Sequence, residues 1–159
     1  MSLTPIDIEK YVEFAQCLFR EYGKDIEKEA IKEVYHRYGG VTWYLQTILN
    51  TLFTMTEPGS TCSTEQIEGA ILQVITQQSF TYSSLHYQLP SKQKEVLMAI
   101  CKEGKAMNIT SRPFLQRHHL TASTVLGAVK GLLDKNFITQ DLGAYSVYDQ
   151  FFAAWLKQQ

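Results

Sequence analysis

The sequence predicts a mainly α-helical fold in which strand is confined to one small hairpin near the C-terminus. Apolar residues recur three and four positions apart through most of the chain, which is the spacing of one helix face. A short alternation of polar residues with residues of high β-strand propensity occurs only around residues 137–148. The chain has 159 residues, of which 45% are hydrophobic and 19% charged, so it suits one ordinary folded domain or two small ones.

Four helices are expected in the first half of the chain. Asp7 is a suitable N-cap for the first, and Gly39-Gly40 ends the second because glycine adopts the left-handed C-terminal conformation without strain. Ser63 and Gln66 have the spacing of a capping box at the start of the fourth. The expected helices cover about residues 8–22, 25–38, 42–56 and 64–85. We therefore predict a four-helix bundle without strand over residues 4–86.

The second half has the order helix, helix, helix, hairpin. The helices are expected at residues 91–103, 112–118 and 121–135, and the strands at 137–140 and 144–148. Leu142-Gly143 can form the tight turn between the strands. This order is that of a winged helix, a variant of the helix-turn-helix, and it predicts such a domain over residues 87–159.

The chain closes with a short aromatic helix that Asp149 can cap. Phe151, Phe152, Trp155 and Leu156 fall on one face of it. Because a terminal helix frays unless it docks, we expect this face to pack on the winged helix or on the helical bundle.

Charge and cysteine usage limit the function classes. Residues 1–87 carry 6 basic and 11 acidic side chains, and residues 88–159 carry 9 and 5, which suits two modules with different surroundings. Cys17, Cys62 and Cys101 have no metal-binding or disulfide-framework spacing, and this suits a reducing cytoplasm. We expect Cys17 and Cys101 in the core, and no membrane span, since no apolar run approaches about 20 residues. Residues 1–3 look like an expression scar.

Residues 121–135 would be the recognition helix of a DNA-binding protein. A helix that reads bases needs Arg, Lys, Asn or Gln on its outer face, but here Lys130 is the one cation before Lys135. We expect Leu126 to face inward, and Gly127 and Gly131 outward, which favours packing against protein over reading DNA. The residues that would contact nucleic acid are Arg112, Arg117, His118, His119, Ser123, Thr124 and Lys130.

Catalytic and metal-binding patterns are missing from the sequence. His118 and His119 are adjacent on a helix and point about 100° apart, so we expect no metal site there. No G-x-x-x-x-G-K-[ST] phosphate-binding loop occurs. The segment 39–43 is explained by a helix end, a tight turn and the next helix start. Alternatively, its two glycines bring a helix N-terminus close to a phosphate.

Two motifs carry a resemblance to a known family. The segments 39–46 (Gly-Gly-Val-Thr-Trp-Tyr-Leu-Gln) and 148–156 (Tyr-Asp-Gln-Phe-Phe-Ala-Ala-Trp-Leu) flank a capped helix and a winged helix. In that order they resemble the C-terminal half of the archaeal-type ATPases, P-loop NTPases of the AAA+/STAND class that also occur in bacteria such as Bacteroidetes. In that family a helical lid carries a G-x-P motif, and the winged helix ends in a D-P-x-x-x-x-W-L-like stretch. Thr42 and Gln150 stand where the family has its two prolines.

The resemblance implies a part of a larger enzyme. Residues Gly39, Gly40, Thr42 and Trp43 would lie near ATP and magnesium held by an N-terminal P-loop core, which would be the main partner. Without Walker A and Walker B segments, this chain should bind no cofactor of its own and should not hydrolyse ATP. We thus expect a cytoplasmic regulatory and interaction fragment of an ATPase, with a further protein partner. The alternative is a winged-helix DNA-binding protein with a helical dimerisation domain.

Overall fold

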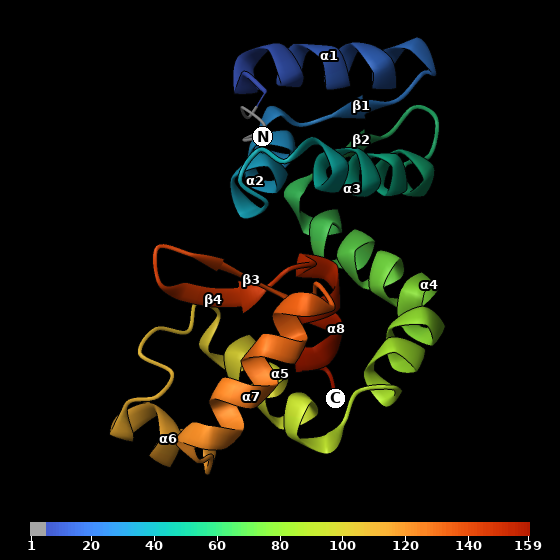
Figure 1. Ribbon diagram of the computed structural model, residues 1–159. Helices are drawn as coiled ribbons and strands as arrows, with labels where there is room; N and C mark the ends of the chain where they lie inside the picture. Colours follow the sequence, from blue (N-terminus) through green and yellow to red (C-terminus); the bar gives the residue numbers. More distant parts are fainter. Residues whose placement is uncertain (1–5) are drawn as a thin grey trace. The chain divides into compact units, whose positions relative to one another are not determined.

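The computed structural model describes residues 6–159 of a mainly helical chain (Figure 1). Residue contacts divide it into two compact units, one ending at Gln77 and the other beginning at Gln78. This division falls inside one helix, α4 (Ile67–Tyr87), whereas the sequence suggested a boundary after residue 86. The reason is that side chains from the last turns of α4 pack into the second unit. The residues interpreted as an expression scar lie outside the described part.

The first unit contains α1 (Ile8–Glu21), α2 (Lys28–Arg37), α3 (Thr42–Met55), a 3-10 turn η1 (Thr64–Gln66) and the start of α4. The Asp7 carboxylate accepts hydrogen bonds from the backbone N–H groups of Glu9 and Lys10, as expected of an N-cap. The capping box of Ser63 and Gln66 is also present. The core of the first unit includes the fully buried side chains of Phe19, Ile31, Leu45, Ile48, Leu52 and Ile67.

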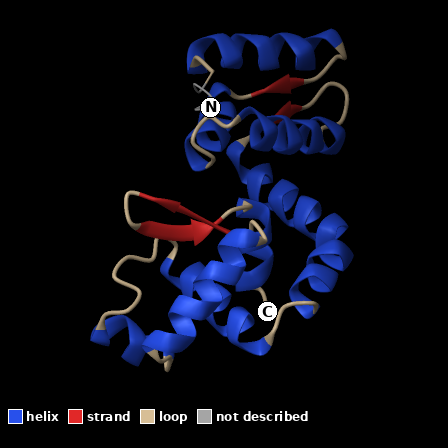
Figure 2. Cartoon of the chain, viewed as in Figure 1, coloured by secondary structure: helices blue, strands red, loops and turns tan. Residues whose placement is uncertain are grey.

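The first unit also contains strand, so the expectation of an all-helical first half was wrong. Strands β1 (Asp25–Ile26) and β2 (Thr61–Cys62) form a parallel pair (Figure 2). The pair satisfies backbone groups of the two connecting loops, since the Glu27 N–H donates to the Cys62 carbonyl at 2.9 Å. Two residues are too few to show the alternation by which a strand is recognised in sequence.

The second unit contains α5 (Ser91–Glu103), α6 (Arg112–His118), α7 (Ala122–Asp134), the antiparallel strands β3 (Ile138–Asp141) and β4 (Ala144–Val147), and α8 (Gln150–Lys157). Leu142 and Gly143 form the turn with φ of +51° and +79°, which matches a two-residue hairpin turn. Ala106 pairs with Tyr145 and adds one isolated antiparallel bridge to the hairpin. The predicted order of elements is confirmed, and each strand bound agrees within one residue.

Helix α8 docks within the second unit, as predicted. Asp149 accepts hydrogen bonds from the Phe151 and Phe152 N–H groups and so caps the helix. The four apolar side chains of its face (Phe151, Phe152, Trp155 and Leu156) are all buried. The Trp155 ring stacks on Phe152 with 5.7 Å between centroids, and its indole N–H donates to the Ser79 hydroxyl at 3.3 Å. These aromatic contacts fix the chain end on the last turns of α4.

Two side chains assigned to the core are instead exposed. Cys17 lies on the solvent side of α1, while Cys101 is buried as expected. Leu126 on α7 is 60% exposed, and Ala128 is buried instead. The buried stripe of α7 is Val125, Ala128, Val129 and Leu132, which has regular helical spacing and leaves Leu126 on the outer side. Within residues 6–159, no helix is long and apolar enough to cross a membrane.

Candidate functional site

The glycine segment between α2 and α3 places its four singled-out residues together, two in the loop and two at the start of α3. Gly39 and Gly40 have φ of +63° and +73°, a region that other residues rarely adopt. The Gly40 N–H donates to the Tyr35 carbonyl at 2.9 Å and closes the end of α2. Thr42 and Trp43 then begin α3, and both are exposed. The loop therefore presents a helix N-terminus whose first turn no side chain caps.

An aromatic cluster supports this loop. Tyr38 stacks on Tyr44 with 5.1 Å between centroids, and Trp43 meets Tyr44 edge-on at 5.0 Å. Burial raises the pKa of the Tyr38 phenol to about 12, so this ring stays neutral. Trp43 remains 56% exposed although its neighbour Tyr44 is buried. The arrangement places a partly exposed indole ring beside the backbone N–H groups of a helix start, which is suited to a planar ring and an anion.

The outer face of α7 offers little for reading DNA. Thr121 caps the helix, and its hydroxyl donates to the Thr124 hydroxyl at 2.8 Å, so Thr124 is engaged within the helix end. Ser123 and Lys130 are exposed, and Lys130 is the one cation within the described helix. The exposed Leu126 beside them is more typical of a protein contact than of a base contact.

Gly131 also differs from its expected outward position. Gln93 of α5 lies over Gly131, in the space that a side chain at this position would fill. The side-chain Oε1 atom of Gln93 in turn accepts a hydrogen bond from the Lys135 ammonium at 2.9 Å. The glycine therefore permits close packing of α5 and α7 inside the domain, rather than packing against another domain.

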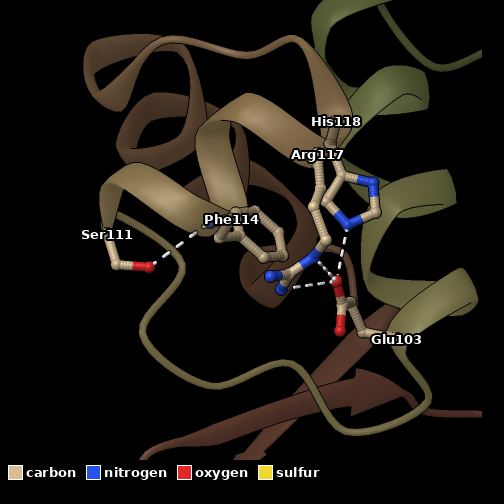
Figure 3. A network of polar contacts seen from close by, with 5 residues as sticks. All are labelled: Glu103, Ser111, Phe114, Arg117 and His118. Carbon is tan, nitrogen blue, oxygen red and sulfur yellow. Dashed lines mark hydrogen bonds and ion pairs between the residues drawn. The ribbon is translucent and has the colours of Figure 1, made fainter.

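Two of the basic residues proposed for nucleic-acid contact are held by one carboxylate (Figure 3). Arg117 donates to the Oε1 atom of Glu103 from Nε at 3.0 Å and from Nη2 at 2.9 Å. His118 Nε2 lies 2.7 Å from the same oxygen. The hydrogen bond from His118, followed by those from Arg117, lowers the pKa of the Glu103 carboxyl. The three residues therefore join the end of α6 to the end of α5.

The remaining basic residues of α6 lie at its two ends. Arg112 is exposed in the first turn, where the Ser111 hydroxyl caps the helix through the Phe114 N–H (Figure 3). His119 follows the last turn with φ of +55° and is exposed. Sequence reasoning missed Glu103, because it lies 14 residues before Arg117 and no local spacing links them. In the described residues no group of three His, Cys, Asp or Glu side chains could hold a metal ion.

Comparison with known families identifies the domain of the second unit. Residues 80–158 match a family model described as a probable winged helix domain. The second unit is a winged helix. This assignment agrees with the helix order, the β3–β4 hairpin and the docked α8. The match to the family model begins at residue 80, within α4, which is close to the division between the two units at Gln78.

A solved structure extends the similarity to the first unit. The Walker-type ATPase of Pyrococcus abyssi matches with a TM-score of 0.66 and 18% sequence identity. The match covers 96% of this chain but only 42% of the ATPase, so the chain spans less than half the length of that protein. At this identity the similarity concerns the fold alone. No curated protein sequence is significantly similar to the chain.

Proposed function

We propose that this chain is the regulatory C-terminal part of a P-loop ATPase of the AAA+/STAND class. The observation that carries the proposal is the fold match with an archaeal Walker-type ATPase, which includes both units rather than the winged helix alone. Winged helices occur in many unrelated proteins, whereas a helical bundle followed by a winged helix is a more specific combination. The finer relationship, to members found in Bacteroidetes, rests on the two sequence motifs.

The first unit would act as a lid over ATP and magnesium bound by a separate P-loop core. Gly39, Gly40 and Thr42 would bring the N-terminus of α3 towards the phosphates, and Trp43 would contact the base or ribose. A lid that contacts nucleotide in one of two arrangements shifts the population towards that arrangement by its difference in affinity. The uncapped start of α3 and the exposed indole support this role.

The winged helix would transmit the nucleotide state to a protein partner. The outer face of α7 supports a protein contact better than a DNA contact, because it carries the exposed Leu126 and one cation. Arg117 and His118, which a DNA-binding model would place on phosphates, are already bonded to Glu103. These observations favour the ATPase fragment over a free-standing DNA-binding protein. We expect the whole assembly in the cytoplasm.

Nucleotide affinity of the complete ATPase tests the lid. Trp43→Ala should weaken MgATP binding several-fold in the product of the whole reading frame, because a base–aromatic contact contributes about 1–3 kcal/mol. Phe80→Ala is the matched control, since Phe80 is an aromatic of the second unit that is 85% exposed. Equal MgATP affinity of the Trp43→Ala variant and the wild type, measured by isothermal titration calorimetry, would contradict the lid role.

A further inference from the structure

A basic hollow of about 410 Å³ lies on the surface of the second unit. The end of α4, one face of α5 and the end of α6 form it. Six of its lining residues are basic or titratable to a positive charge, and they come from all three elements: His86, Lys94, Lys102, Arg117, His118 and His119. The hollow is thus distinct from the outer face of α7 and from the β3–β4 hairpin, which contribute no lining residue.

Two of these cations have no acidic partner. Lys94 and Lys102 are two helical turns apart on α5, so their side chains share one face. Neither ammonium group forms a salt bridge with any residue in the described range 6–159. The Lys94 ammonium lies 5.4 Å from the centroid of the exposed Tyr87 ring. These two charges are therefore available to a ligand.

The acidic groups near the hollow are already engaged. Glu95, the acidic residue of the lining, pairs with Lys92 at 3.7 Å, and Glu103 binds Arg117 and His118. Lys94 and Lys102 therefore form no ion pair with either of these two carboxylates. His86 responds to this environment, because burial, followed by the positive charge of Lys94, lowers the pKa of its imidazole.

We propose that this hollow binds a compact phosphate-bearing small molecule, held by the ammonium groups of Lys94 and Lys102 with donors from His86 and His119. Lysine ammonium groups bind phosphate as point charges, and the volume lies within the range of small-molecule sites, about 300–1,000 Å³. A nucleic acid would instead need a stripe of cations along its backbone. The recognition helix α7, which a helix-turn-helix places in the major groove, contributes no residue to the lining. This site does not depend on the relationship with ATPases.

Calorimetric titration of the whole chain with inorganic pyrophosphate at low salt tests the site. The double variant Lys94→Gln/Lys102→Gln should bind pyrophosphate roughly tenfold more weakly, since it removes both unpaired charges. Lys105→Gln/Lys130→Gln is the matched control, because it removes the same net charge from residues outside the hollow. Its pyrophosphate affinity should stay within about twofold of the wild type.

Proton NMR of the imidazole signals gives a second measurement. Saturating pyrophosphate should raise the pKa of His86, because an anion offsets the charge of Lys94. His36 lies in the first unit, so its signals are an internal reference that should not respond. If the double variant fails to fold, Lys102→Gln alone replaces it, because this side chain is exposed.

Three results would overturn the proposal. The first is no binding of pyrophosphate at millimolar concentration. The second is equal weakening in the double variant and its control, which would indicate non-specific attraction. The third is a duplex DNA that binds more tightly than pyrophosphate and loses its affinity in the Lys94→Gln/Lys102→Gln variant, which would assign the hollow to nucleic acid.

Discussion

Trp155→Ala removes the largest side chain of the face by which α8 docks. In the wild type this indole is 5% exposed, stacks on Phe152 and donates a hydrogen bond to Ser79. It also lies 6.1 Å from the Tyr82 ring and 5.8 Å from the His86 ring, measured between centroids. The substitution therefore leaves a cavity surrounded by side chains of α4 and α8.

The expected cost can be estimated from this environment. A tryptophan buries about 150–250 Å², worth roughly 4–6 kcal/mol at about 25 cal/mol per Å², and alanine retains part of it. Measured Trp→Ala substitutions in cores cost about 3–5 kcal/mol, and we expect that range here. Ser79 is half-buried and can bind water, so the lost hydrogen bond adds little. The free energy of unfolding of a domain of about 80 residues is roughly 4–12 kcal/mol in total, so this loss is about a quarter of it or more.

Urea unfolding followed by far-UV circular dichroism measures the loss. Trp43 remains as the single tryptophan of the variant, and its fluorescence then reports the first unit. Phe80→Ala is the control for loss of an aromatic ring, and it should cost no more than about 0.5 kcal/mol because Phe80 is largely exposed. An unchanged midpoint for Trp155→Ala, or equal effects of the two variants, would refute the reasoning.

Other substitutions probe the backbone and the charge network. Leu142→Asn should stabilise the chain by about 1 kcal/mol, because Leu142 is exposed at φ +51° and Asn-Gly is preferred in this turn. A lower thermal midpoint of the variant would contradict this prediction. Gly127→Ala should also raise the free energy of unfolding by about 1 kcal/mol, since open space surrounds the new methyl group. Gly131→Ala must displace Gln93, so it should raise the free energy of unfolding by less in the same denaturation assay. The neighbouring imidazole and guanidinium lower the pKa of the Glu103 carboxyl in the folded state. The ionised carboxylate therefore stabilises the fold above its ordinary pKa of 4.5. This stabilisation is lost as the pH falls through the lower pKa of the folded state. Glu103→Gln should therefore reduce the dependence of urea stability on pH below 4.5, and an identical pH profile would count against the network.

The helices and their order could be predicted because their signals are local. The bounds of α5 and α6 agree with the structure to the residue. Pro90 precedes the apolar stripe of α5, and Ser111 caps the start of α6. In α7 the expected position was wrong for Leu126, which is exposed, and for Gly131, which Gln93 covers. The sequence prediction did not include Ala128, which is buried and completes the regular stripe.

The features that sequence reasoning missed depend on contacts between distant residues. Strands β1 and β2 join segments more than 30 positions apart and contain two residues each. The Glu103 network and the basic hollow combine side chains from separate helices, so no single motif reveals them. The glycine loop was found because its signal is contiguous, but its proximity to a nucleotide is still a prediction that rests on the family resemblance.

The coding sequence immediately upstream of the Thr4 codon tests the ATPase relationship most directly. Our account predicts that sequencing it reveals an in-frame P-loop core, with a G-x-x-x-x-G-K-[ST] motif after a strand and an acidic magnesium-binding strand further along. The full product should then hydrolyse ATP, while the 159-residue chain alone shows no turnover above background. A stop codon directly upstream, or an in-frame domain without a P-loop, would contradict the account.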